Sequence, residues 1–244
     1  MPFRLVPLED GLSPLTLRHT LAVCHRWQEA LISRTNDLPS PVREILSGHA
    51  ATGEPLQGAH LAFLPIPQDA QDSSLFGLAA AIPATLAESE IRQVFFALGR
   101  VDELALGSLG RWRLVCPSTF PAHERRWLAH ESALCGPATH WATATPIVFD
   151  RHPKAKSEAG ALRETTAMIE QACLRAGLPR PCQITLSRAS ALPGHPPAQA
   201  FPFLARKDGS PRSHTHALLV FPHPVRGPIL LGAGRYKGYG LCRA

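Results

Sequence analysis

Apolar residues recur at spacings of three and four in three stretches of the sequence, and this period predicts three amphipathic helices. The first follows Ser13 and Pro14, which have the form of an N-cap and a proline at the first helical position. The second is expected over residues 88–99, and the third ends at Gly177 and Pro179. Their predicted inner faces are Leu17, Leu21, Cys24, Trp27 and Leu31 in the first helix, Ile91, Val94, Phe95 and Leu98 in the second, and Leu162, Thr166, Ile169 and Cys173 in the third.

Shorter apolar runs between these helices predict strands. The order in the first half is β-α-β-β-α-β, and the second half reads β-α-β-β, with its second helix shortened or replaced by residues 222–231. The first order is that of the ferredoxin-like fold, in which two helices cover one face of a four-stranded antiparallel sheet. We therefore expect an α+β protein with two tandem ferredoxin-like, or RRM-like, domains. The strands are expected at residues 3–8, 60–66, 75–82, 104–115, 142–149, 183–187 and 214–221.

Segments rich in proline, glycine and polar residues separate the predicted elements. Residues 34–59 have this composition and are expected to form a long loop, which in a compact domain is often functional. Prolines, histidines and arginines are also frequent in residues 119–140, which we interpret as a linker with some basic surface. The expected domains are therefore residues 1–118, which would carry the catalytic site, and residues 141–244.

The composition favours a polyanionic partner without requiring one. The 244 residues are 45% hydrophobic, enough for a buried core, and carry a net charge of +6 with a pI of about 9.3. Six cysteines without a C-x-x-C pair argue for reduced thiols in a cytosolic protein, not a zinc site or a disulfide framework. We expect no metal or other cofactor. Because neither a signal peptide nor an apolar run of about 18 residues is present, we expect a cytoplasmic protein without a membrane partner.

The segment from Gly227 to Cys242 combines five glycines with two cations and two aromatic rings, and it follows a predicted strand. Glycine lets the backbone approach a ligand closely, while cations and aromatic rings suit phosphates and stacked bases. This combination indicates binding to the backbone of RNA or DNA. A tight hairpin that closes a sheet would explain the glycines equally well. The residues concerned are Gly232, Gly234, Arg235, Tyr236, Lys237, Gly238 and Tyr239.

Three stretches resemble a known family in their order and spacing: residues 46–67, LSGHAATGEPLQGAHLAFLPIP, residues 141–154, WATATPIVFDRHPK, and residues 224–243, PVRGPILLGAGRYKGYGLCR. They are similar to the C-terminal half of the type I-G (formerly I-U) CRISPR protein that joins a backbone-type Cascade subunit to a CRISPR-RNA-processing endoribonuclease of the RAMP superfamily. The upstream backbone-type half of that protein is not in this sequence.

The resemblance implies an endoribonuclease that cuts precursor CRISPR RNA within its repeat without a metal and leaves a 2',3'-cyclic phosphate. The expected partners are CRISPR repeat RNA, the processed crRNA and other subunits of a type I Cascade effector, in which the protein would stay bound to its product. The segment Gly232–Gly240 looks like the glycine-rich loop of the superfamily and would bind RNA. Arg151 and Lys154, with Arg125 and Arg126, would extend this binding track, although a solvated charged face explains these four cations equally well.

Metal-free cleavage of RNA needs a base for the 2'-hydroxyl, an acid for the leaving oxygen and cations for the phosphate, and histidine can fill either proton-transfer role. His49 is our first candidate, because it lies after the first helix, where related nucleases carry a catalytic histidine. An acidic residue usually follows that histidine, and here Ala50 takes its place. His60 is the candidate acid. His25, with His19, is the fallback.

Each of these histidines also has a structural interpretation: His49 as a surface residue that fixes a turn, His60 as a residue packed on a sheet edge, and His25 as a solvated helix position. His152 reads better as a turn or phosphate-contact residue than as a catalyst. Two other functions stay open. The protein could be a non-catalytic CRISPR-RNA-binding subunit, or a two-histidine phosphoesterase suggested by His60 and His214, although that family places Ser or Thr where Ala62 and His216 occur.

Overall fold

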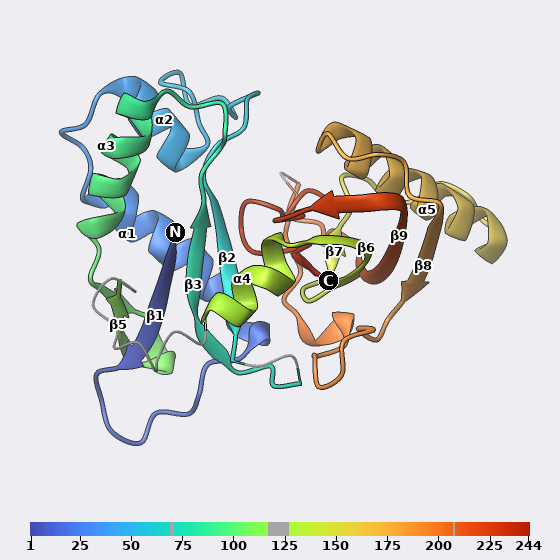
Figure 1. Cartoon of the computed structure of the whole chain (residues 1–244), viewed down its shortest axis with the longest axis horizontal. Helices are drawn as coiled ribbons and strands as arrows, with labels where there is room; N and C mark the ends of the chain where they lie inside the picture. The colour runs from blue at the N-terminus through green and yellow to red at the C-terminus, as the bar shows by residue number, and fades with distance from the viewer. Residues whose placement is uncertain (69–70, 117–126, 207) are drawn as a thin grey trace. The chain divides into compact units, whose positions relative to one another are not determined.

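The computed structural model describes residues 1–68, 71–116, 127–206 and 208–244, with side chains omitted for residues 127–130 (Figure 1). The chain divides into two compact units, which are described separately. Unit 1 comprises Met1–Gln68 and Ser74–Ala122, and unit 2 comprises Asp69–Ser73 and His123–Ala244. No helix in the described ranges is both long enough and apolar enough to span a bilayer.

Unit 1 is a ferredoxin-like sheet with one added edge strand. Its strands follow the order β2-β3-β1-β5-β4, and all neighbours are antiparallel. Without the short β4, this is the order that two interleaved β-α-β units produce. The elements are β1 (Pro2–Pro7), α1 (Thr20–Ser33), α2 (Ser40–Ser47), β2 (Ala62–Pro67), β3 (Leu75–Ala81), α3 (Glu88–Gly99), β4 (Glu103–Ala105) and β5 (Arg111–Val115).

The core of unit 1 is built around Trp27 of α1, which is completely buried. Its ring makes edge-to-face contacts with Phe3 of β1 and Phe63 of β2, at centroid distances of 5.2 and 5.0 Å. This is the geometry that aromatic pairs prefer. Helix α2 contacts both α1 and α3, so the three helices form a connected layer. Cys24, Trp27 and Leu31 of the predicted inner face are buried, whereas the predictions that Phe95 and Leu162 lie on inner faces were wrong, because their side chains are 42% and 53% exposed.

Unit 2 repeats the same strand order with a different second crossover. Both β6 and β8 pair with residues 218–220 of β9, so they flank this strand, and β10 pairs with the outer edge of β6. The resulting order, β10-β6-β9-β8, matches β5-β1-β3-β2 of unit 1, while the short β7 pairs with the start of β9. The elements are α4 (Trp127–Cys135), β6 (Pro137–Thr143), β7 (Ile147–Val148), α5 (Glu158–Arg175), β8 (Gln183–Ser187), β9 (His214–Arg226) and β10 (Cys242–Arg243).

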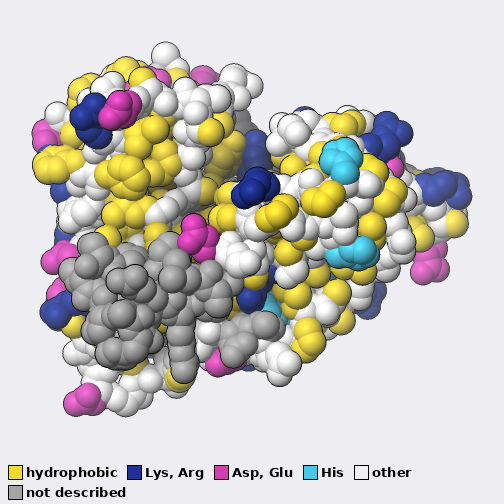
Figure 2. Space-filling view, viewed as in Figure 1, with side chains coloured by type: hydrophobic (Ala, Val, Ile, Leu, Met, Phe, Trp, Pro, Cys, Tyr) yellow, Lys and Arg dark blue, Asp and Glu magenta, His cyan; other side chains and the backbone are white. Residues whose placement is uncertain are grey.

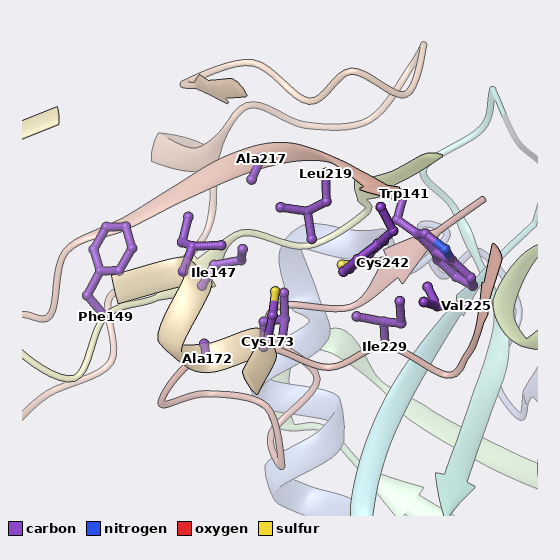
Figure 3. Close-up of a cluster of buried hydrophobic side chains, with 13 residues drawn as sticks. Trp141, Ile147, Phe149, Ala172, Cys173, Ala217, Leu219, Val225, Ile229 and Cys242 are labelled. Atoms are coloured by element: carbon purple, nitrogen blue, oxygen red, sulfur yellow. The ribbon is translucent and has the colours of Figure 1, made fainter. Parts of the chain in front are cut away.

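The core of unit 2 joins α5 to one face of this sheet (Figure 3). Ile169 and Cys173 of α5 are buried against alternate residues of β9, which is the period-2 pattern of a strand with one covered face. Burial raises the pKa of the Cys173 thiol to about 12, so it behaves as a small hydrophobic side chain. The strand and loop residues of this core are Trp141, Ile147, Phe149, Ala217, Leu219, Phe221, Val225, Ile229, Leu231 and Cys242.

The expected fold class, two tandem ferredoxin-like α+β halves with antiparallel sheets, is confirmed. The helix over residues 88–99 and the strand over residues 183–187 have the predicted bounds. The absence of a second helix in the second half is also confirmed for the described residues between β9 and β10. Strand β9, however, continues to Arg226, five residues beyond its predicted end, because β6 pairs with it over that length.

Other boundaries were wrong. The expected loop 34–59 contains α2, whose Val42, Ile45 and Leu46 face the core. The expected strand 104–115 is a hairpin of β4 and β5, because Gly107 and Gly110 adopt positive φ angles that end each strand. The expected linker 119–140 contains α4 and the start of β6, whereas the first helix begins at Thr20, after a single 3-10 turn and not at Pro14.

Candidate active site and nucleic-acid interface

One predicted catalytic histidine of unit 1, His60, packs on Gly48, the residue that precedes the other, His49. Gly48 ends α2 with φ of 74°, in the left-handed region where glycine is favoured. A Cβ atom at Gly48 would lie 2.6 Å from Nε2 of His60, so the imidazole of His60 packs directly on the Gly48 backbone. His49 is the next residue. The C-terminus of α2 and the residues before β2 therefore bring the His60 imidazole onto the residue that precedes His49.

The hydrogen bonds of His49 define its tautomer. Its Nδ1 is 3.1 Å from the carbonyl oxygen of Ser47, and its backbone N–H donates to Ser47 Oγ at 3.1 Å. Because a carbonyl only accepts, Nδ1 carries the proton and Nε2 carries the lone pair. No hydrogen bond within the described ranges uses Nε2, and the side chain is exposed. His49 can therefore accept a proton at Nε2.

The loop that carries His49 is an ordered hairpin and not the open loop that its composition predicts. The amides of Ala50 and Leu56 donate to Glu54 and Gly48 carbonyls, each at 2.8 Å. The Glu44 carboxylate accepts from the Ala51 amide at 3.0 Å and from the Ser40 hydroxyl at 3.2 Å. This carboxylate thus holds the loop to both ends of α2, a positioning role that the sequence analysis missed.

A cavity of about 240 Å³ opens beside His49. Its lining includes the apolar Ile32, the guanidinium of Arg43 and the carboxylate of Glu44. No ion pair of Arg43 is found in the part of the chain that the structure describes, so its charge is available to an anion. Arg43 was not predicted as a site residue, because residues 34–59 were expected to form a loop, in which its position next to His49 could not be deduced.

The other histidines of unit 1 are held in local contacts. Nδ1 of His60 lies 3.4 Å from the carbonyl oxygen of Gly58. His25 is exposed on α1, 3.7 Å from the Glu29 carboxylate one turn away. His19 accepts a hydrogen bond from the Thr16 amide, and burial, with a smaller contribution from the charge of Arg18, lowers its pKa. The structure records no contact of His25 or His19 with the His49 loop among the described residues.

In unit 2, the glycine loop (residues 232–240) is packed tightly against its surroundings. A Cβ atom at Gly232 would lie 2.3 Å from the Val148 carbonyl oxygen, and one at Gly240 would lie 1.9 Å from that of Leu231. Both residues also have positive φ angles. The side chain of Tyr239 is completely buried, and its hydroxyl donates to the carbonyl oxygen of Pro202. The expectation that Tyr239 could stack on a base is therefore wrong, because it is a core residue.

The other side of the glycine loop exposes cations. The guanidinium of Arg235 lies 4.4 Å from the centre of the Tyr236 ring and donates to the Gly232 carbonyl oxygen at 3.2 Å. Lys237 is exposed. No hydrogen bond in the described ranges uses the amides of Gly234 or Gly238. Gly234 and Gly238 are themselves buried, so the loop presents two cations and one half-buried ring, which is a suitable surface for a phosphate and a base.

Arg151 and Lys154 are in a different environment. The guanidinium of Arg151 donates to Glu164, and the same carboxylate accepts from the amides of Lys154 and Ala155 at 2.7 and 3.1 Å. These two backbone bonds are the main reason that the pKa of Glu164 is lowered, and Arg151 adds to them. The charge of Arg151 is thus partly neutralised, whereas the Lys154 side chain is exposed. Arg125 and Arg126 lie outside the described residues.

Three histidines of unit 2 lie in β9 or in the segment that precedes it: His214 and His216 belong to the strand, and His195 belongs to the segment. Nε2 of His216 is 3.1 Å from the Pro196 carbonyl oxygen, and its Nδ1 is 2.9 Å from the Thr143 hydroxyl. Burial is the main reason that the pKa of His216 falls to about 4, which makes it a neutral structural residue. Burial also lowers the pKa values of His195 and His214. No group of three or more His, Cys, Asp or Glu side chains in the described ranges is arranged to hold a metal ion.

Part of the chain is similar to a known protein family. Residues 129–244, just under half of the chain, match the family described as "CRISPR-associated protein, GSU0054 family". No curated protein matches the sequence. The solved structure described as "An RAMP protein binding different RNA substrates" is 13% identical, with a TM-score of 0.46, over 99% of this chain and 97% of that chain. The one described as "Csf5, CRISPR-Cas type IV Cas6 crRNA endonuclease" is 14% identical, with a TM-score of 0.34, over 100% and 98%. The C-terminal part, which includes the glycine loop, is thus similar to a CRISPR-associated family.

Proposed function

We propose that the protein is a metal-independent endoribonuclease that cleaves precursor CRISPR RNA within its repeat, with His49 as the general base. The observation that carries this proposal is a cavity lined by both His49 and Arg43, with His60 packed on Gly48, the residue next to His49. The match of residues 129–244 to a CRISPR-associated family supports repeat RNA as the substrate. The glycine loop supplies the exposed cations that bind this RNA.

The chemistry needs two proton transfers and one anion site. Nε2 of His49 takes the proton of the 2'-hydroxyl, and the 2'-oxygen attacks the adjacent phosphorus. The bond from phosphorus to the 5'-oxygen of the next nucleotide breaks, and protonated His60 donates a proton to that oxygen. Arg43 stabilises the negative charge on the phosphate in the transition state. The products are a 2',3'-cyclic phosphate and a 5'-hydroxyl end. If His49 is not the base or His60 is not the acid, His25 is the next candidate for that role.

Retention of the product is the second part of the proposal. The glycine loop binds the processed RNA through the exposed side chains of Arg235 and Lys237, and the protein carries this RNA into a Cascade-type effector. Tyr236, whose ring Arg235 covers, contributes a stacking surface. Arg151 and Lys154 extend the track, with Lys154 contributing more because its side chain is exposed and Arg151 is bonded to Glu164.

The test is single-turnover cleavage of a repeat RNA at saturating protein in excess EDTA, with the ends of the products identified. We expect cleavage with a 2',3'-cyclic phosphate end. His49→Ala should lower the rate by roughly two to four orders of magnitude, the range for loss of a general acid or base, while RNA affinity stays within about twofold. The matched control is His223→Ala, which removes an exposed histidine of β9.

Two results would contradict the proposal. Abolition of cleavage by the chelator would rule out the metal-free mechanism. Cleavage by His49→Ala at the rate of the parent protein would remove His49 from the mechanism, and His60→Ala and His25→Ala would then identify its replacement. Arg43→Gln is expected to lower the cleavage rate more than the affinity, because Arg43 is assigned to charge that develops in the transition state.

One observation favours a non-catalytic RNA-binding subunit. Nδ1 of His49 faces the Ser47 carbonyl oxygen and not a carboxylate, since Ala50 stands where the family usually has an acid. A neutral carbonyl stabilises an imidazolium less than a carboxylate does. A pure binder would retain full RNA affinity and effector assembly in His49→Ala, and the parent protein would show no cleavage.

A further inference from the structure

We propose that Phe203, stacked on His214, is a platform for an unpaired RNA base that extends the binding surface of the glycine loop. This inference rests on the RNA-binding part of the proposed function, but not on cleavage. Phe203 lies in the proline-rich segment before β9. None of the sequence patterns considered above distinguishes it.

Phe203 presents an open aromatic ring on a fixed support. Its exposed fraction is 59%, a high value for a phenylalanine. The ring lies 4.8 Å from that of His214 with an angle of 29° between their planes, so the two rings are stacked. One side of the phenyl ring is thus covered by an imidazole, and the exposure comes from the rest of the ring. A base added to the open side would continue the stack.

His214 is itself held rigidly, which fixes the platform. Its Nε2 lies 2.7 Å from the carbonyl oxygen of Ala198, and because a carbonyl only accepts, this nitrogen carries the proton. Its ring is also 6.3 Å from that of the buried Tyr239. Burial lowers the pKa of His214, so the neutral ring that stacks on Phe203 is the form present at neutral pH. An ordered ring loses little conformational freedom when a base binds.

The residues on both sides of Phe203 are attached to the glycine loop. The carbonyl oxygen of Pro202 accepts the hydrogen bond of the Tyr239 hydroxyl. The side chain of Leu204 packs on Gly234, where a Cβ atom would lie 2.9 Å from its Cδ1. Phe203 therefore belongs to the same rigid surface as the segment that exposes Arg235, Tyr236 and Lys237.

The charge around the ring favours a nucleic acid over a protein partner. Residues 201–214 contain Arg206, Lys207 and Arg212 against Asp208 alone, and the glycine loop adds Arg235 and Lys237. The centres of protein–protein interfaces are depleted of charge and enriched in several apolar side chains. Here one exposed ring lies in a segment whose sequence carries more cations than anions, which is the composition of sites that track a phosphate backbone and stack its bases.

The experiment measures binding of repeat RNA, and of short single-stranded RNA, by Phe203→Leu and Phe203→Trp in parallel with the parent protein. Leucine retains apolar volume and removes the aromatic ring. We expect Phe203→Leu to raise Kd roughly 5- to 150-fold, the effect of one lost base–aromatic stack, without changing the salt dependence. Phe203→Trp should bind at least as tightly as the parent. The matched control is Phe96→Leu on α3, whose ring is 61% exposed and covered on one side by Arg100.

Abasic nucleotides placed one at a time in the RNA locate the partner of the ring. At one position, the abasic RNA should weaken binding by the parent protein but not by Phe203→Leu. The platform is overturned if the parent protein binds and cleaves RNA while Phe203→Leu binds within twofold of it, and also if this variant loses only a protein partner. Loss of cleavage in His49→Ala has no bearing on this result. If the parent protein binds no RNA, the platform and the proposed function both fail.

Discussion

The two units share one strand order but differ in the crossover that leads to the last strand. In unit 1, α3 makes this crossover, and Val94, Ala97 and Leu98 bury one side of it. In unit 2, residues 227–241 make it without a helix, and they bury Ile229, Leu231, Tyr239 and Leu241 instead. Both connections therefore contribute side chains to a core. The comparison shows that a crossover does not need to be a helix to contribute side chains to the core. Most of its backbone N–H and C=O groups must then form hydrogen bonds with other parts of the chain.

The outer surfaces of the two crossovers differ in consequence. An α-helix satisfies its own amides, so α3 can present only side chains, including Phe95 and Phe96 at 42% and 61% exposure, and hydrophobic groups gather over this part of unit 1 (Figure 2). The glycine loop instead exposes the cations of Arg235 and Lys237. Replacing the helix thus converts a packing element into a surface that is able to bind an anion.

The largest expected difference between the crossovers comes from the same substitution made in each. Gly240→Ala should destabilise unit 2 by about 3 kcal/mol or more, because the new Cβ would lie 1.9 Å from the Leu231 carbonyl oxygen at a φ of 67°. Gly99→Ala at the end of α3 meets no atom within 4 Å and should stabilise unit 1 by up to about 1 kcal/mol. Denaturant unfolding of both variants measures the contrast. Equal effects would show that the glycine loop is not tightly packed.

Acid should affect unit 2 more than unit 1, because the buried histidines of the described chain, His195 and His216, both lie in unit 2. The pKa of His216 is about 4 in the fold, below its ordinary value of 6.5. Between pH 4 and 6.5 the unfolded chain binds more protons than the folded one. The neutral His216 therefore contributes to the free energy of unfolding above pH 6.5, and this contribution is lost as the pH falls to 4. The loss is about 3 kcal/mol for a difference of this size.

Native-state hydrogen exchange of the β6 and β9 amides, measured against pH, tests this expectation. His216→Gln retains a donor for the Pro196 carbonyl oxygen and removes the titration, so its stability should change less between pH 6.5 and 4 than that of the parent protein. Amides of β1 and β3 serve as the internal control. An unchanged pH dependence in the variant would exclude His216 as the source.

A smaller difference is expected between the two tyrosines of the glycine loop. Tyr239→Phe leaves the Pro202 carbonyl oxygen without its buried donor, and the cost should be about 1–2 kcal/mol. Tyr236→Phe removes a half-buried hydroxyl whose contact with Arg235 is 3.4 Å long, and the change should stay within about 0.5 kcal/mol. Thermal unfolding distinguishes the two variants. A larger effect of Tyr236→Phe would contradict the assignment of Tyr239 to the core.

The sequence predicts the fold where local periodicity and tertiary packing agree. The bounds of α3 follow from its apolar spacing and its acidic first turn, and the strand order follows from the alternation of elements. Helix α2 was not predicted, because Pro39, Pro41 and its length of only eight residues suggest a loop. Its apolar residues Val42, Ile45 and Leu46 nevertheless have helical spacing. A short run of apolar residues at helical spacing can thus indicate a helix even in a segment whose proline content suggests a loop.

The candidate site could be predicted only in part. His49 and His60 follow from the chemistry of their residue type, but their approach to Gly48 depends on how α2 ends and where β2 begins. Arg43 joins them only through α2. Tyr239 was misassigned because its residue type suggested stacking, whereas its alternation with Leu241 indicates a buried strand-like face. The residue type therefore indicates which chemical roles a side chain can have. Which side chains lie close together depends on where each helix and strand begins and ends, and the sequence did not predict this for α2.

The smallest expected effect compares one cation from each crossover. Arg235→Gln in the glycine loop should reduce the salt dependence of RNA binding by about 0.7 in the slope of log K against log salt, because one phosphate contact on a single strand is lost. That change corresponds to about fivefold weaker binding near 0.1 M salt. Arg92→Gln removes an equal charge from α3, where Arg92 is 72% exposed and pairs with Glu88 at 3.1 Å. Its slope should not change, since Arg92 is assigned no phosphate contact and a charge without one releases no counterion. If both variants lowered the slope equally, the net charge of the protein would explain the binding, and the glycine loop would have no special contact with RNA.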